Sequence, residues 1–190
     1  MLSFCKVYMN ITDIYITDRL VKYIWRDDMT QKQAELQHEL EDTQRGRFLT
    51  FALGNEDFGI EIKYVTEIVG LQPISQLPEV PAFIKGIINL RGRIIPVVDV
   101  RIKFKKEQAA YTDRTCIIVI DTGDVNAGLI VDNVAEVIGM ADENISPPPD
   151  MGTGVQNKYI MGVGKVGDKV KLLLDCRKLF SHEEAQALNQ

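Results

Sequence analysis

The sequence repeats itself, and this duplication constrains the fold more than any other feature. Residues 48–70 align with residues 117–139 without a gap. Gly59 meets Gly128 in this alignment, 69 positions further along the chain, and apolar positions match apolar positions throughout. A constant spacing between similar stretches indicates a duplicated structural unit. We therefore expect two copies of one fold.

The second half of each copy aligns as well. Residues 83–104 match residues 159–180, and the offset is now 76 positions. Asp99 meets Asp175, and each aspartate stands two residues before an arginine. The offset grows from 69 to 76 positions because the second copy carries an insertion around "SPPPDMGTGV". This insertion is the main break in the symmetry.

Each copy contains short runs rich in Val, Ile and Phe, such as "FLTFAL", "FGIEI" and "IIPVVDV", separated by Gly and Asn. Such runs between turn residues are typical of β-strands. Strands that are apolar on both faces need cover on both sides, and two small β-barrels packed together supply it without open edges. Pro96 inside one run indicates an edge or a bulge. We expect a mainly β fold with two tandem barrels, over about residues 48–104 and 115–180.

Residues 1–45 match neither copy and are interpreted as an N-terminal extension. Thr30 opens a T-x-x-Q capping box, which predicts a helix over residues 30–45. Residues 1–28 precede Met29, which is followed at once by this helix. Two interpretations are open: these residues belong to the protein, or translation starts at Met29 and they are an artefact of start assignment.

A second capping box marks the other end of the chain. Ser181 and Glu184 form an S-x-x-E pattern, which predicts a short C-terminal helix over residues 181–190. Both helices are expected at the periphery of the barrels.

Cysteine usage and hydropathy limit the location of the protein. Cys5, Cys116 and Cys176 are far apart and form no C-x-x-C pair, so neither a disulfide framework nor a zinc site is indicated. No run approaches the roughly 20 apolar residues of a membrane helix. Asp13 and Asp18 interrupt any signal-peptide pattern. We expect a cytoplasmic protein without membrane insertion.

No set of residues points to catalysis. His38 and His182 are the two histidines, and both lie in expected exposed helices. The sequence lacks the H-E-x-x-H, G-x-S-x-G, P-loop and G-x-G-x-x-G motifs. Asp99 and Asp175 recur in both copies, which favours a structural role such as turn capping or a bridge to arginine. We expect no enzymatic activity, no cofactor and no metal.

Positive charge gathers in one window. The formal net charge is -5, yet residues 84–106 hold seven basic residues against one acid, Asp99. The window could form an electropositive stripe for an acidic protein surface, or its lysines could protect a strand edge from aggregation. The lysines concerned are Lys103, Lys105 and Lys106.

An alternative function uses the same window. A small SH3-like or OB-like barrel could bind nucleic acid through these basic residues, but such modules interleave exposed aromatic side chains. Phe104 aligns with Phe180 and is therefore expected in the core. No nucleic-acid partner is expected on this ground.

Differences between the copies are more informative than their similarities, because only one copy needs to carry a binding site. In "NLRG", Asn89 aligns with Lys165 and Arg91 aligns with Gly167. A shared structural requirement therefore does not explain these two polar residues. We interpret the turn as a display of Asn89 and Arg91 to a partner.

The segments "GIEIKYVTEIVG", "PAFIKGIINLRGRIIPVVDVRIKF" and "GLIVDNVAEV", in this order, resemble the CheW family of bacterial chemotaxis coupling proteins. The resemblance covers residues 48–180, and it implies one CheW-like domain over residues 46–180. It also implies two SH3-like five-stranded barrels and a non-catalytic adaptor. The implied partners are the cytoplasmic tips of methyl-accepting chemoreceptors and the regulatory domain of the histidine kinase CheA, in arrays at the membrane.

The resemblance further implies which residues bind the receptor. Apolar side chains would line a groove between the barrels that a helical hairpin fills, and charged side chains at its rim would set the register. The implied receptor-binding residues are Ile62, Val65, Glu67, Gly86, Asn89, Arg91 and Val134.

The insertion in the second copy is the candidate for a kinase contact within rings of adaptor and kinase. Three consecutive prolines favour a stiff polyproline II segment that presents the residues after it. The implied contact residues are Pro149, Asp150 and Met151.

Overall fold

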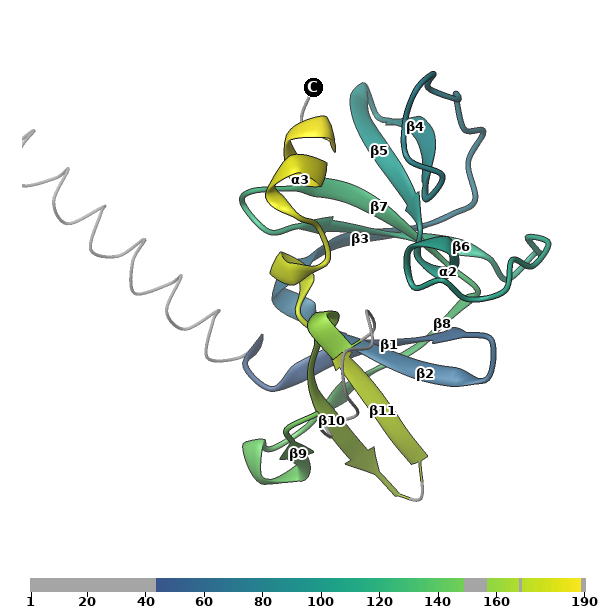
Figure 1. Cartoon of the computed structure of the whole chain (residues 1–190). Coiled ribbons are helices and arrows are strands. Elements are labelled where there is room, and N and C mark those ends of the chain that lie inside the picture. The colour runs from purple at the N-terminus through teal and green to yellow at the C-terminus, as the bar shows by residue number, and fades with distance from the viewer. Residues whose placement is uncertain (1–43, 149–156, 168, 189–190) are drawn as a thin grey trace, which may run out of the picture. The chain divides into compact units, whose positions relative to one another are not determined.

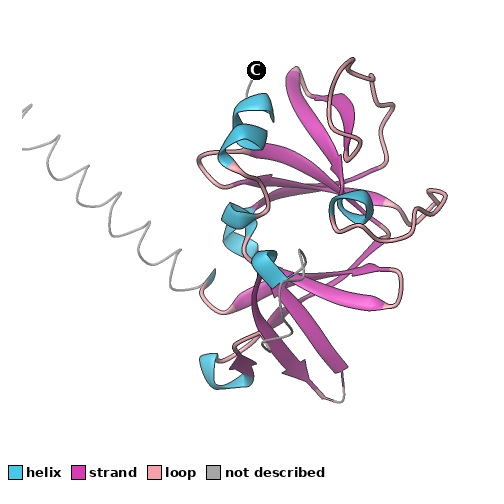
Figure 2. Ribbon diagram, in the orientation of Figure 1, coloured by secondary structure: helices cyan, strands magenta, loops and turns pink. Residues whose placement is uncertain are grey.

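Short strands and tight turns dominate the chain, and the computed structural model describes residues 44–148, 157–167 and 169–188 (Figure 1). The chain divides into two units, residues 1–43 and residues 44–190, and the second unit holds all the described structure. The predicted mainly β fold is confirmed, with two sheets and few short helices (Figure 2). The predicted extension, its helix and the start-site question lie outside the described residues.

The first half of the described chain contains strands β1 to β5. Their bounds, with those of the short helices among them, are β1 Arg47–Leu53, β2 Glu56–Glu61, η1 Ile62–Tyr64, β3 Val65–Gly70, β4 Ile84–Leu90, β5 Arg93–Asp99 and α2 Val100–Lys103.

The second half follows the same order. Its elements are β6 Cys116–Asp121, β7 Asn126–Val131, β8 Asn133–Gly139, η2 Asp142–Asn144, β9 Ile145–Ser146, η3 Asn157–Tyr159, β10 Ile160–Val166, β11 Lys169–Leu174, η4 Cys176–Lys178 and α3 His182–Leu188.

The strands form two sheets of the same design. Sheet A has the order β8-β1-β2-β11-β10-β9, and sheet B has the order β3-β6-β7-β5-β4. Apart from β9, replacing each strand by its equivalent in the other repeat converts one order into the other. The register agrees too, because Leu173 pairs with Gly59 in sheet A and Val97 pairs with Gly128 in sheet B. The duplication read from the sequence therefore extends to the backbone pairing.

The sheets do not follow the predicted barrel bounds of 48–104 and 115–180. Sheet A combines β1 and β2 of the first repeat with β8 to β11 of the second, and sheet B combines β3 to β5 with β6 and β7. The cause is local. Only Asp132 separates β7 from β8, and a hairpin needs a connection of at least two residues. The chain therefore crosses to the other sheet at this point.

Both sheets close through the segment that follows their edge strand. Beyond β3, Ser75 exchanges two backbone hydrogen bonds of 2.9 Å with Ile87 of β4. Beyond β8, β9 pairs with β10, where Ser146 lies opposite Val163. These contacts give each sheet the closure expected of a small barrel.

Three apolar clusters fill the described part of the chain. One lies within sheet B around Ile117 and Val119, and a smaller one lies within sheet A around Phe48 and Leu173. The largest joins residues of both sheets. A row of aromatic rings runs through it with centroid separations of 5.8, 5.7 and 5.5 Å, in the order Phe51, Phe58, Phe104 and Tyr159. Phe104 is buried, as predicted.

The duplicated aspartates cap the turns that follow β5 and β11. Asp99 accepts hydrogen bonds from the backbone N–H groups of Arg101 and Ile102 at 2.9 and 3.3 Å. Asp175 accepts one from the N–H of Arg177 at 3.1 Å. Capping satisfies donors that a helix start leaves free. The predicted structural role of this pair is confirmed.

The C-terminal capping box forms as the sequence predicts. The backbone N–H of Ser181 donates to Glu184 at 2.8 Å, and the N–H of Glu184 donates to the Ser181 hydroxyl at 3.2 Å. These bonds cap the start of α3, which spans His182–Leu188.

Gly86→Ala should destabilise the fold by about 2 kcal/mol or more, since it combines backbone strain with overpacking. Gly86 has φ 136°, and an added Cβ would clash with the Ser75 carbonyl oxygen and lie 2.8 Å from its carbon. Urea unfolding measures the change. Gly70→Ala is the control, because the space beside Gly70 is open, and it should stay within about 0.5 kcal/mol. An unchanged midpoint for Gly86→Ala would show that the Ser75 segment can move aside.

Candidate functional site

The turn between β4 and β5 is a strained one. Arg91 and Gly92 have φ values of 52° and 87°, and two positive values in a two-residue loop define a type I′ hairpin. The side chain of Asn89 accepts a hydrogen bond of 2.8 Å from the Gly92 N–H. In the other repeat, Gly167 takes the place of Arg91 with φ 60°. A non-glycine residue there costs about 1 kcal/mol, so the turn itself does not favour an arginine.

Arg91 reaches across the barrel seam to Glu67 of β3. Its Nη2 atom lies 3.6 Å from Oε2 of Glu67, and 86% of the arginine side chain is exposed against 26% of the glutamate. An exposed ion pair contributes at most about 1 kcal/mol, and this one is long. The structure thus brings together Glu67, Asn89 and Arg91, but intramolecular stability accounts for little of the arrangement.

Gly86 is buried and cannot contact a receptor through a side chain. Its backbone lies against the Ser75 segment that closes sheet B. The close approach predicted from its repetition as Gly162 is present at both sites, because a Cβ on Gly162 would lie 3.2 Å from the Ser146 carbonyl oxygen. Gly86 therefore shapes the close approach between β4 and the Ser75 segment.

The three apolar residues of the predicted set are half-buried. Ile62, Val65 and Val134 all pack against the large cluster between the sheets. Val65 pairs with Ile120 at one end of β6. Burial raises the pKa of the Cys116 thiol, and a hydrogen bond with the Val134 backbone opposes this rise. Val134 therefore lies near the other end of β6, and four residues of strand span about 13 Å.

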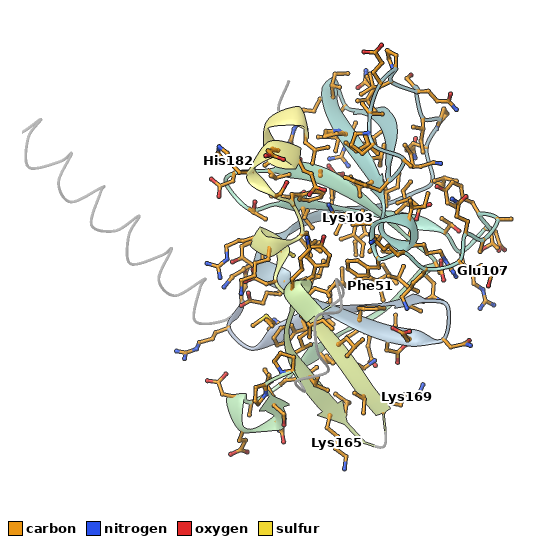
Figure 3. All side chains as sticks on the ribbon, viewed as in Figure 1. Phe51, Lys103, Glu107, Lys165, Lys169 and His182 are labelled. Atoms are coloured by element: carbon orange, nitrogen blue, oxygen red, sulfur yellow. The ribbon has the colours of Figure 1, made fainter. Side chains whose placement is uncertain are left out.

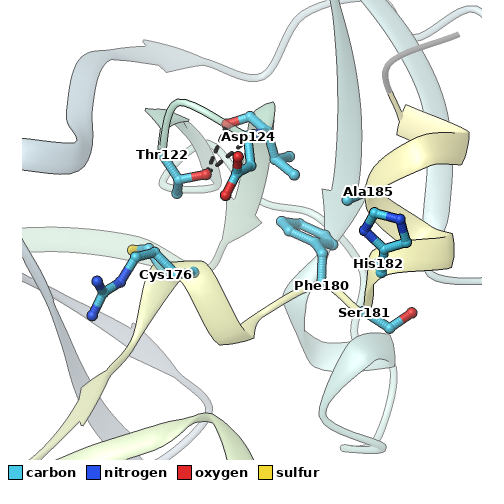
Figure 4. A pocket seen from close by; sticks show the side chains of 9 residues that line it. Thr122, Asp124, Cys176, Phe180, Ser181, His182 and Ala185 are labelled. Atoms are coloured by element: carbon cyan, nitrogen blue, oxygen red, sulfur yellow. Dashed lines mark hydrogen bonds between the residues drawn. The ribbon is translucent and has the colours of Figure 1, made fainter.

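The described part of the chain also holds two pockets of similar size. One of about 440 Å³ lies between the β6–β7 turn, η4 and α3 (Figure 4), and one of about 450 Å³ lies beside Lys169 and Val170. None of the predicted receptor-binding residues lines either pocket. The groove expected between Val65 and Val134 stays a prediction.

The basic window is not an open positive stripe. Within it, Arg91 pairs with Glu67, Lys106 with Glu56 and Lys103 with Glu184. A fourth residue, Arg101, donates hydrogen bonds to Asp132 from two guanidinium nitrogens, and its Nε lies 2.6 Å from Oδ1.

The Arg101 pair also fixes the protonation of its partner. Burial alone would raise the pKa of Asp132, but the Arg101 guanidinium and the Gly54 N–H hold it below its ordinary value. Four of the seven basic residues thus lie against carboxylates. The window therefore gives little support to the nucleic-acid alternative.

Both predictions for Lys103 are wrong: it belongs neither to an electropositive surface stripe nor to an exposed strand edge. Its side chain is 4% exposed. By contrast, Lys165 and Lys169, beside the β10–β11 turn, are exposed (Figure 3). Lys103 aligns with Leu179 in the duplication. That mismatch of a lysine with a leucine was the signal in the sequence that could have revealed a buried amine.

Three other predictions concern the kinase contact, metal binding and membrane insertion. Pro149, Asp150 and Met151 lie outside the described residues. Among the residues described, side chains of His, Cys, Asp and Glu form no cluster of three or more that could hold a metal ion. None of the described helices combines the length and apolar composition that a membrane crossing requires.

Comparison with known proteins bears on the whole domain. A family model described as a CheW-like domain matches residues 47–184. Chemotaxis protein CheW of Klebsiella aerogenes is 38% identical over 143 residues, covering 75% of this chain and 86% of that protein. The CheW of Treponema pallidum is 36% identical over 146 residues, with coverage of 75% and 86%. The crystal structure of the scaffolding protein TtCheW from Thermoanaerobacter tengcongensis matches with a TM-score of 0.66 and 37% identity, covering 72% of this chain and 92% of that one.

Exchanging residues between the equivalent turn positions tests the strain at Arg91. Arg91→Gly removes a side chain from the left-handed region and should leave the free energy of unfolding within about 1 kcal/mol of wild type or raise it. Gly167→Arg should lower it by about 1 kcal/mol. Denaturant titration of both variants measures the difference. A large loss of stability in Arg91→Gly would instead make the Glu67 contact a structural one.

Proposed function

Because the chain belongs to the CheW-like domain family, we propose that it is a chemotaxis scaffold that couples the cytoplasmic tips of chemoreceptors to the histidine kinase CheA. The observation that carries the proposal is Arg91, an exposed arginine held in a conformation that suits glycine. Strain of this kind is retained where a side chain serves a partner.

The scaffold works by binding its partners and not by catalysis. Support comes from three buried or half-buried carboxylates that already hold partners within the fold. Asp99 caps α2, Asp132 is gripped by Arg101, and Glu184 contacts Lys103. Groups engaged in this way maintain the fold and are poorly placed to transfer protons to a substrate.

The receptor tip is a helical hairpin, and the proposed contact face suits one. Val65 and Val134 lie beside Ile120 and Cys116 of β6, two residues about 13 Å apart along that strand, which is the length of roughly nine helical residues. Ile62 continues the apolar face from the turn before β3. Affinity arises from these apolar contacts, as in other helix-in-groove complexes.

Orientation of the hairpin arises from the charged end of the face. Arg91 and Glu67 lie within 3.6 Å of each other in the free protein. A receptor carboxylate can approach the exposed guanidinium, and the partly shielded Glu67 can accept a receptor donor. Asn89 holds the turn through Gly92, so its effect on binding is to keep Arg91 in place.

The kinase contact uses Pro149, Asp150 and Met151 in the insertion of the second repeat. Its partner is the regulatory domain of CheA, and the resulting rings recruit the scaffold to receptor arrays at the membrane. Support comes from the duplication, because the first repeat folds without this insertion and the fold therefore does not require it.

Arg91→Gly should weaken binding to a receptor signalling tip by about 10-fold or more, the effect of losing an arginine that carries binding energy in an interface. A pull-down with purified receptor fragment measures it. Arg93→Ala is the matched control, since Arg93 is an exposed basic residue on the same hairpin, and it should bind normally. Equal loss in both variants would indicate a general effect of positive charge, and no loss in Arg91→Gly would remove Arg91 from the interface.

Met151→Glu should prevent the assembly of extended arrays with kinase while binary receptor binding persists, because a charge placed in an apolar contact must be desolvated without a partner. Electron microscopy of reconstituted arrays and a receptor pull-down give the two readouts. Intact arrays in this variant would exclude the loop from the ring contact.

A further inference from the structure

Lys103 places an ammonium group in the junction between the two sheets. Its Nζ atom lies 2.6 Å from Oε2 of Glu184 on α3. The same atom lies 4.0 Å from the centre of the Phe83 ring, 5.2 Å from Phe180 and 5.8 Å from Tyr159. Cations are attracted to aromatic faces at such distances. The lysine is thus held by one carboxylate and an aromatic cage.

The other repeat shows that the fold does not need a charge at this position. Leu179 is the equivalent residue, and it is 2% exposed. A buried ion pair is often no more stabilising than apolar residues of similar volume, and its best-attested use is to fix one arrangement or to form a switch. The Lys103–Glu184 pair therefore calls for an explanation other than stability.

The pair joins elements of both sheets to the last helix. Phe83 precedes β4 of sheet B, and Tyr159 precedes β10 of sheet A. Helix α3 has seven residues, and isolated helices below about 12 residues are marginal in water. Its order depends on its capping box and on docking through Leu188 and Glu184.

The state of Glu184 fits this role. Burial alone would raise the pKa of Glu184, but the hydrogen bonds from Lys103 and from the Ser181 N–H hold it below its ordinary value. The carboxylate is therefore ionised at neutral pH and available both to the cap and to the lysine.

We propose that α3 is a strap held closed by the buried Lys103–Glu184 ion pair, and that it opens without unfolding of the two barrels. The closed strap forms one wall of the pocket beside Phe180, Ser181 and Ala185 (Figure 4). Opening uncovers the cage around Lys103 at the junction of the sheets. The chain then has two states of this junction, and a partner that prefers one of them shifts the balance.

Hydrogen exchange of the full chain tests the strap. Glu184→Gln keeps the size of the side chain and removes its charge, so the amides of residues 182–188 should exchange about 10-fold faster or more, as local opening becomes easier. The amides of β6 and β7 should be unchanged. Glu183→Gln is the matched control on the same helical turn, where the side chain is exposed, and it should leave α3 as in wild type.

Two results would overturn the proposal. Unchanged exchange in α3 of Glu184→Gln would show that the pair does not hold the helix. Faster exchange across both sheets, with a lower melting temperature, would show that the pair belongs to the global core. Neither result depends on receptor or kinase binding, so the strap can fail while the proposed function stands.

A double variant separates the strap from simple loss of packing. Lys103→Leu with Glu184→Gln places the leucine of the other repeat at position 103 and keeps an S-x-x-Q capping box, and it should melt within about 3 °C of wild type or higher. Its α3 amides should exchange more slowly than in Glu184→Gln. A variant that fails to fold would contradict the proposal, because the charge would then be required by the core.

Discussion

Asp132 is the single residue between β7 and β8, and this connection, too short for a hairpin, takes the chain from sheet B to sheet A. The strand leaving β7 cannot fold back on its neighbour, so it joins the sheet of the other repeat. The first repeat makes the same change of sheet through η1. Each sheet consequently contains strands from both repeats, and neither can form from one repeat alone. The same aspartate also anchors Arg101 and the Gly54 N–H, so the crossing point is fixed by charge as well.

This exchange places the largest apolar cluster between the sheets and not inside one of them. Ile62, Val65 and Val134 lie at its margin because they stand at or beside the crossings, where the chain changes sheet. A partner that lies along them touches both sheets at once. A partner bound at the crossings therefore contacts the junction between the sheets, whereas a partner bound at an outer edge contacts one sheet only.

Much of this arrangement can be predicted from the sequence, because duplication shows which positions are equivalent and glycines show where the backbone is crowded. The Asp99 and Asp175 caps, the C-terminal capping box and the tight packing at Gly86 follow from local patterns. The strand exchange does not, because an alignment identifies equivalent strands without saying which copy they pair with. The prediction of an exposed positive stripe over residues 84–106 was wrong for a related reason. The carboxylates that pair with its basic residues, such as Asp132 and Glu184, are distant in sequence.

Equivalent positions that differ between repeats carry information that neither repeat holds alone. In sheet A, Asp57 lies 3.4 Å from the buried ammonium of Lys171. The equivalent positions in sheet B are Asn126 and Ile95. Sheet B has isoleucine in place of the lysine and a neutral amide in place of the aspartate, and a carboxylate there would lack its cation. The exchange is incomplete, because Asn126 Oδ1 is buried without a hydrogen-bond partner among the described residues. One barrel thus retains a paired charge in its wall, and the other retains the polar half of that pair.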